Sequence, residues 1–173
     1  MAFVVETGEG LENATSYVDL DYASDYADSF FTSAMYELWN SATEADLERS
    51  LNRATMYLDS TYVFKGIPKT TTQALQFPRD MIYASDMTAI VGVPKAIKQA
   101  TCLAAVRLLS GTSMSPDVSR NGVIREKIDT IDITYESGGS KYTKFTEIDN
   151  LLSLSNLITN NRNVSNNVRL VQG

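Results

Sequence analysis

The sequence has 173 residues, 43% of them hydrophobic, and a net charge of −6, which suits a single domain with a buried core. It holds no histidine and only one cysteine, Cys102, which excludes the commonest metal ligand, the usual general base near neutral pH and an internal disulfide. No apolar run approaches the roughly 20 residues that cross a bilayer, and the acidic start of the chain predicts no signal peptide and no membrane partner.

Charge is divided unevenly along the chain. Residues 1–50 carry eleven acids and a single base, Arg49, whereas residues 151–173 carry no acid and two bases, Arg162 and Arg169. This asymmetry predicts different surroundings for the two ends. An acidic surface that only keeps the protein soluble is an equally good explanation of the front half.

The first element is an irregular arm over residues 1–18, indicated by Gly8, Gly10 and several turn-forming residues. Asp19 is a good N-cap, and alanine and phenylalanine then recur at helical spacing. This pattern predicts a helix over about residues 20–36. Three acids occupy its outer face: Asp21, Asp25 and Asp28.

A second helix is predicted over about residues 42–60. Ser41 and Glu44 have the spacing of a capping box, in which each side chain bonds the backbone near the other. Leucine and alanine follow at intervals of three and four, which gives the helix one apolar face. Gly66 and Pro68 prevent its continuation.

Residues 63–93 are predicted to be mostly irregular. Pro78 has no backbone donor and favours an extended conformation at Phe77. We interpret Phe77 as an anchor in the core. Arg79 is expected to pair with a carboxylate, either of its own chain or of a neighbouring subunit.

Pro94 suits the first turn of a third helix, which Gly111 would end. Its apolar stripe is wide, so the helix is expected to be buried over much of its surface. Cys102 lies within the stripe and is interpreted as a small core residue, because no histidine is present to activate its thiol.

Alternation of Ile131, Ile133 and Tyr135 with polar residues predicts a half-exposed strand. Ile124 and Ile128 either begin this strand or form a short strand before it. Thr146 is then predicted to cap a short helix. The inward-facing residues of that helix would be Ile148, Leu151 and Leu152.

The chain ends in an asparagine-rich segment, residues 159–173, predicted to be a flexible tail. Val168 and Leu170 would let it add a strand to a partner's sheet, and a frayed terminus is the alternative. The expected fold is therefore mainly α: one domain over residues 1–158, a bundle of three to four helices with a short β element, and extended arms at both ends.

Catalytic chemistry finds no support in the sequence. Zinc-ligand, calcium-loop and nucleotide-binding patterns are missing, so we expect neither an enzyme nor a cofactor or metal site. Nucleic-acid binding requires clustered bases, yet the aromatic residues lie mainly in the acidic front half. A modest basic zone mixed with acids consists of Arg120, Arg125, Lys127, Lys141 and Lys144.

An ordered set of short motifs resembles a bacteriophage family often labelled "DnaT-like single-stranded DNA binding". The set comprises Glu6-Thr7-Gly8, the segment Asn13 to Val18, Trp39, the helix Leu51 to Asp59, and Gln73 to Arg79. Pro94 and the leucine-rich stretch from Ile148 to Leu152 continue the order, over roughly residues 6–155. The chain departs from the pattern at Phe77, where tryptophan is expected, and in its asparagine-rich tail.

The resemblance implies a structural virion protein, a head–tail adaptor. Such adaptors form a ring, usually of twelve copies, beneath the portal protein. The ring extends the channel through which genomic double-stranded DNA passes without specific binding, and it docks a nozzle or tube protein of the tail. The protein would be made in the host cytoplasm and reside at the head–tail interface of the virion.

Residue roles follow from the resemblance only as expectations. The acids Asp21, Asp25 and Asp28 would line the channel or an intersubunit surface. The tail, with Arg162, Arg169, Val168 and Leu170, would contact the portal or the tail protein. Tyr17, Trp39, Phe77, Pro78 and Arg79 would be structural anchors. The family label favours a different function, that of a single-stranded DNA-binding replication accessory, which stays as the alternative.

Overall fold

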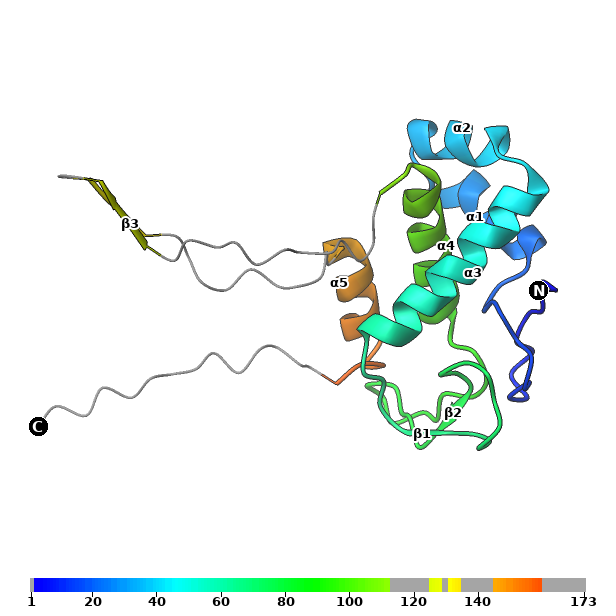
Figure 1. The fold of residues 1–173 in the computed structure, drawn as a ribbon. Helices are drawn as coiled ribbons and strands as arrows, with labels where there is room; N and C mark the ends of the chain where they lie inside the picture. The colour runs from blue at the N-terminus through cyan, green and yellow to red at the C-terminus, as the bar shows by residue number, and fades with distance from the viewer. Residues whose placement is uncertain (1, 113–124, 129–130, 135–144, 160–173) are drawn as a thin grey trace, which may run out of the picture.

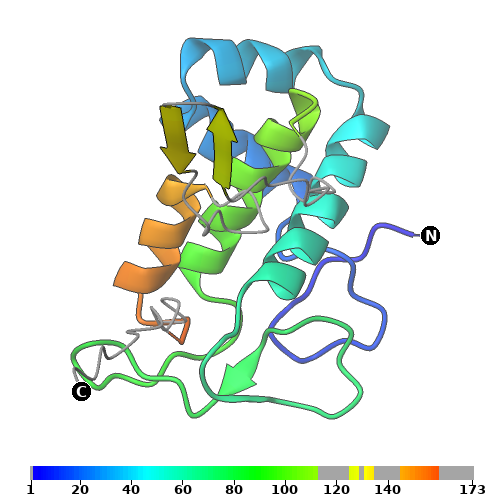
Figure 2. The same ribbon diagram turned by 60° about the vertical axis from the view of Figure 1, so that its left-hand side comes forward.

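The structure, a computed structural model, describes residues 2–112, 125–128, 131–134 and 145–159. These residues form five helices and two short antiparallel strand pairs, which confirms the mainly α prediction. In Figure 1, α3 (Glu44–Thr61) crosses in front of the central α4 (Lys95–Leu109), and α1 (Leu20–Phe30) lies behind it. α2 (Ser33–Ser41) covers one end of the body. Figure 2 shows α5 (Thr146–Leu154) and α3 on opposite sides of α4.

The core is organised around α4, as its wide apolar stripe predicted. Every residue from Ala100 to Val106 is buried, including the free thiol of Cys102. Burial raises the pKa of Cys102 to about 12, so the thiol stays protonated near neutral pH. Cys102 is a core residue in this structure.

The predicted helix over residues 20–36 is instead two helices. Asp19 caps α1 as expected, its side chain accepting a hydrogen bond from Tyr22 N at 2.7 Å. The helix ends at Phe30, and Thr32 starts α2 by accepting a hydrogen bond from Met35 N at 3.4 Å. The helical spacing of apolar residues continues through this break and concealed it in the sequence. The chain breaks there nonetheless, because the local cap at Thr32 outweighs the periodicity.

The starts of two other helices differ slightly from the predictions. Thr43, and not Ser41, is the N-cap of α3, with its side chain accepting a hydrogen bond from Asp46 N at 3.2 Å. Ser41 is the last residue of α2. Thr146 is the first residue of α5, which has no side-chain cap, although Ile148 is buried as predicted.

The two strand pairs are short. β1 (Ile67–Pro68) pairs with β2 (Arg79–Asp80) within the otherwise irregular stretch that was predicted. β3 (Arg125–Ile128) pairs with β4 (Ile131–Thr134), so a preceding strand does form, the second of the two alternatives. Tyr135 and residues 160–173 of the tail lie outside the described residues, whereas Thr159 is described and its N donates to Val63 O at 2.9 Å. Among the described residues, none of the helices has the length and apolar character that a membrane crossing requires.

Candidate functional site

The candidate site lies in the loops at the end of the body that contains β1 and β2 (lower end in Figure 1). Three segments meet there: the arm loop (residues 6–11), the first loop (residues 64–80) and the second loop (residues 80–93). They contain little regular structure, so their backbone groups need other hydrogen-bond partners. Buried polar side chains supply many of these partners.

A hydrogen-bond network around Tyr17 fixes the first loop to α3. The buried Tyr17 hydroxyl donates to Asp59 Oδ1 at 2.5 Å and accepts from Phe77 N at 3.1 Å. Asp59 Oδ2 accepts from Gln76 N at 3.0 Å. Burial raises the pKa of Asp59 to about 6, partly opposed by these hydrogen bonds, and it raises the pKa of Tyr17 as well.

Phe77 and Arg79 hold the same loop from inside. The ring of Phe77 is fully buried, with its centroid 5.0 Å from that of Phe64 and 6.3 Å from that of Tyr17, and its bond to the buried Pro78 is cis. Phe77 and Pro78 are therefore core anchors, as predicted.

Arg79 does not form the carboxylate pair that was expected from its own chain. Its guanidinium donates to the backbone oxygens of Lys65 (2.8 Å), Gly66 (2.9 Å) and Gln76 (3.2 Å), and to Gln76 Oε1 at 2.8 Å. These oxygens belong to loop backbone without enough amide partners, and the forked donor set of arginine suits them. Arg79 thus closes the first loop upon itself.

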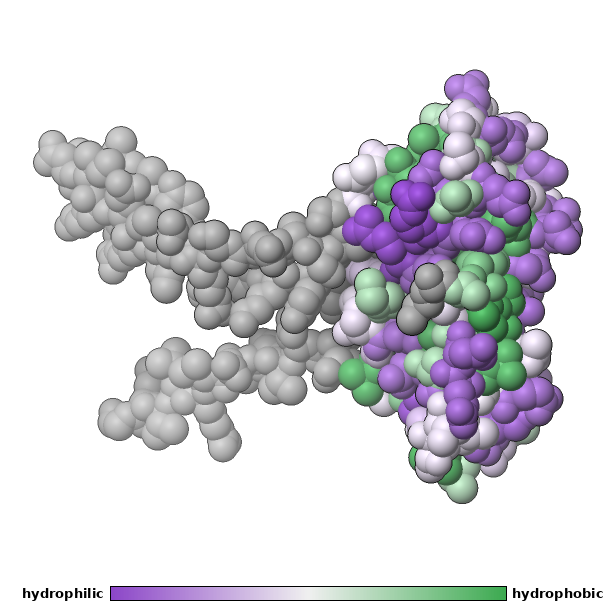
Figure 3. All heavy atoms as spheres, turned by 45° about the vertical axis from the view of Figure 1, so that its right-hand side comes forward, coloured by the Kyte–Doolittle hydropathy of each residue, from purple (hydrophilic) through white to green (hydrophobic). Residues whose placement is uncertain are grey.

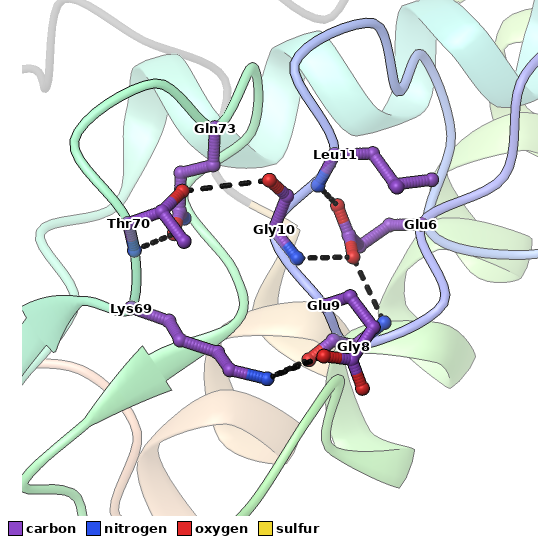
Figure 4. A network of polar contacts seen from close by, with 8 residues as sticks. All are labelled: Glu6, Gly8, Glu9, Gly10, Leu11, Lys69, Thr70 and Gln73. Carbon is purple, nitrogen blue, oxygen red and sulfur yellow. Dashed lines mark hydrogen bonds and ion pairs between the residues drawn. The ribbon is translucent and has the colours of Figure 1, made fainter.

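The arm loop is organised around the carboxylate of Glu6 (Figure 4). Glu6 is buried, and its Oε1 accepts from Gly8 N at 2.8 Å and from Gly10 N at 2.9 Å, while Oε2 accepts from Leu11 N at 2.9 Å. Three amides thereby compensate the burial of one charge. The Glu-Thr-Gly motif is accordingly part of a turn whose backbone amides bind the carboxylate of Glu6.

The arm loop is also fixed to the first loop (Figure 4). Lys69 Nζ donates to Gly8 O at 2.9 Å and lies 3.0 Å from Glu9 Oε2, and Ala74 N donates to Leu11 O at 2.9 Å. Near residue 5 the arm pairs with Ser16 and folds back along the body. The described part of the predicted arm is therefore packed against the domain.

Ile67 of the first loop and four residues of the second loop are exposed apolar side chains, which we call the apolar ledge. Its members are Ile67, Met81, Tyr83, Met87 and Val91, with 47–83% of their surface exposed. Residues 82–90 form a hairpin-like turn, in which Ile90 N donates to Ile82 O at 2.9 Å. In Figure 3, hydrophobic residues form separate patches among hydrophilic ones, and one patch lies at this end of the body.

Two residues of the apolar ledge adopt a costly backbone conformation. Met81 and Met87 have φ angles of 59° and 65°, a region that residues other than glycine rarely occupy. Strain combined with exposed, adaptable apolar side chains is typical of surfaces that bind another protein.

The other predicted site residues lie elsewhere. Asp21, Asp25 and Asp28 are exposed on α1, and Asp28 lines a shallow hollow of about 220 Å³ with residues of α2. Trp39 is a buried anchor, 6.0 Å from the ring of Phe31. The predicted partner-contacting residues Arg162, Val168, Arg169 and Leu170 lie outside the described residues.

The sequence prediction missed Glu6 and Asp59 as supports and missed the apolar ledge. A weak signal was present in Met81 and Met87, two large apolar residues in a stretch without helical or strand periodicity. Within the described residues no group of acids or cysteine has the arrangement needed to hold a metal ion.

Comparison with known proteins gives one positive result. The family described as "Putative DnaT-like ssDNA binding protein" matches residues 1–173, so the chain belongs to this family. None of the curated proteins compared with the chain matches it, and no solved structure does.

Proposed function

We propose that this member of the DnaT-like family is a structural assembly subunit: a head–tail adaptor that forms a ring beneath a phage portal and docks the tail through protein–protein contacts. The observation that carries the proposal is the apolar ledge, which lies mainly on the second loop. This loop is held by the pairing of β1 with β2, by its own hairpin-like turn and by a hydrogen bond from Asn156 Nδ2 to Tyr83 O at 3.0 Å. Loops fixed in this way present a preformed surface, which lowers the entropy lost on binding. An exposed apolar surface of this kind suits a protein partner better than a phosphate backbone.

The charge of the body supports the same function. Fourteen acids and eight bases occupy residues 1–112, and the exposed acids of α1 would repel phosphates. In a channel wall such a surface would let duplex DNA slide past without binding it. This role for Asp21, Asp25 and Asp28 is part of the proposal.

The experiment that tests this function mixes the purified chain with the portal protein of the phage that encodes it and images the product by electron microscopy. We expect an added ring layer on the portal. The variant M81S/M87S/V91S should fold normally and lose the layer. Met56→Ser is the matched control, because Met56 is an equally exposed methionine on α3, and it should keep the layer. A portal without the added layer in the presence of the wild-type chain would refute the proposal.

A second candidate function is single-stranded DNA binding by a replication accessory, and the family description favours it over the adaptor function. Its bases would come from the zone around β3, which carries Arg125 and Lys127. Fluorescence anisotropy with a labelled oligothymidylate at 50 and 200 mM salt separates the two functions. Submicromolar binding that weakens about tenfold or more with salt, and that is lost in R125A/K127A, would favour this second function.

A further inference from the structure

A hollow opens where α2, α3 and α4 meet, at the end of the body opposite β1 and β2. It has a volume of about 350 Å³, and its apolar lining includes Leu38 of α2 and Leu108 and Leu109 of α4. Arg49 and Arg53 of α3 line it on the polar side. Because a closed cavity of about 150 Å³ can hold a benzene ring, this hollow has room for an aromatic side chain. We call it the arginine hollow.

The two arginines differ in what they bind. Arg49 forms an exposed ion pair with Asp46, its NH1 lying 3.0 Å from Oδ1. Arg53 is exposed on the next turn of α3, and its guanidinium has no hydrogen bond or ion pair with any of the residues that the structure describes. The arginine hollow therefore offers a free cation beside an apolar floor.

A second surface, which carries acids and an exposed aromatic ring where the arginine hollow has a cation and a recess, lies where α1 meets α2. It carries Asp25, Asp28 and Glu37, all exposed, and residues 20–48 contain no base. None of these three acids has an ion pair within the described parts of the chain. Phe30 projects beside them with 64% of its surface exposed, stacked on Tyr26 at a centroid distance of 4.9 Å. We call this surface the acidic corner.

The arginine hollow and the acidic corner cannot meet within one molecule. The arginine hollow is lined by α2, α3 and α4, whereas the acidic corner is carried by α1 and α2, so the two surfaces occupy different parts of the same body. Two different complementary surfaces on one chain produce a head-to-tail contact between copies. Repetition of such a contact closes into a ring when the rotation between copies allows it.

We propose that the arginine hollow receives the acidic corner of a second copy of this chain, with Phe30 of that copy against the leucine floor and its Asp25 or Asp28 beside Arg53. This inference rests on the proposed ring-forming function and names the contact that builds the ring. It matches a free cation with unpaired acids and an exposed aromatic ring with an apolar hollow. Aromatic anchors surrounded by complementary charges are typical of binding hot spots.

Nucleic acid fits the arginine hollow less well. Asp46 lines it beside Arg49, and Glu44 and Glu48 lie on the same stretch of α3. A phosphate would meet one free cation among several acids, whereas a tight phosphate contact needs clustered bases. A carboxylate on a second copy needs only one pairing arginine, together with the apolar contact of Phe30.

Charge reversal tests the contact in the full-length chain. We expect the wild type to self-associate at low salt in sedimentation velocity runs at concentrations up to about 1 mM. Arg53→Glu and the double variant D25R/D28R should each weaken self-association by about tenfold or more. The combined variant R53E/D25R/D28R restores opposite charges across the contact and should recover most of the affinity. Phe30→Ser should weaken association at unchanged charge.

Lys95→Glu is the matched control, because Lys95 is an exposed base at the far end of α4, and its reversal should leave association unchanged. Melting curves would show that each variant is folded. A wild type that stays monomeric to about 1 mM, or charge reversals without effect, would overturn the inference, and so would oligothymidylate binding that depends on Arg53. If association behaves as expected but no ring layer forms on the portal, the contact stands and the adaptor function fails.

Discussion

Replacement of Tyr17 by phenylalanine tests whether the buried hydroxyl holds the first loop on the body. The substitution keeps the ring that packs edge-on against Phe77. It removes one hydrogen bond to the partly buried Asp59 carboxylate and one from the buried Phe77 N. Because the change is confined to one oxygen atom, the loss of stability reports the network and not the packing.

The magnitude follows from the two lost bonds. A hydrogen bond to a charged group contributes about 1.5–3 kcal/mol and a neutral one about 1 kcal/mol. We therefore expect the free energy of unfolding to fall by about 3 kcal/mol, a large share of the roughly 5–15 kcal/mol typical of a domain. With a urea dependence of about 2 kcal/mol per molar, the midpoint of unfolding should fall by about 1.5 M.

Urea unfolding at pH 7, followed by the fluorescence of the single tryptophan, Trp39, measures this shift. Trp39 is buried in the core, so its emission should change on global unfolding. Tyr36→Phe is the matched control, because the hydroxyl of the partly exposed Tyr36 has no hydrogen bond to any residue that the structure describes. A Tyr17→Phe midpoint within about 0.25 M of the wild type, equal to about 0.5 kcal/mol, would refute the reasoning.

Three further predictions concern the same loops. Folding raises the pKa of Asp59 from 3.8 to about 6. Between pH 3.8 and pH 6 the folded chain therefore binds more protons at this group than the unfolded chain does. The stabilisation that this group contributes is lost as pH rises through 6. Wild type should therefore gain about 1 kcal/mol relative to Asp59→Asn between pH 7 and pH 5 in urea titrations, and equal slopes would contradict the assignment. Glu6→Gln puts an amide donor against backbone donors and should cost about 1–3 kcal/mol, with faster hydrogen exchange at Gly8, Gly10 and Leu11, whereas the exposed Glu12→Gln should change neither quantity. Gly66→Ala would place Cβ 2.2 Å from Asp80 O at a φ of +74° and should lower the free energy of unfolding by more than about 2 kcal/mol. Gly111→Ala is the control: its φ is +79°, but nothing lies within 4 Å of the new Cβ, so it should lower stability by only about 1 kcal/mol. Equal melting temperatures of the two variants would contradict the steric explanation.

Local patterns predicted the helical body well. The Asp19 cap, the apolar face of α3 and the wide stripe of α4 depend on residues a few positions apart, and the structure confirms all three. The break at Phe31 was missed because the apolar spacing continues through it. The signal was the pair Thr32–Ser33, since a threonine that accepts a hydrogen bond three residues later can start a new helix.

The supports of the loops were beyond prediction from spacing alone. Tyr17 meets Asp59 across 42 positions and Phe77 across 60, and Lys69 meets Gly8 across 61. No local rule connects such residues, because the fold of the helices decides which loops come together. Phe77 and Pro78 were recognised as anchors by their chemistry, whereas the buried roles of Glu6 and Asp59 contradict the usual exposure of acids.

Because Cys102 is buried, its reaction with thiol reagents can be used to measure unfolding of the chain. A thiol inside α4 with a pKa near 12 is closed to reagents that attack thiolates, so it should react only when the core opens. The rate of labelling would then give the frequency of opening for the free subunit and for the assembled protein. Because no second thiol competes, a cysteine placed on the apolar ledge or the acidic corner can carry a single probe while Cys102 remains protected.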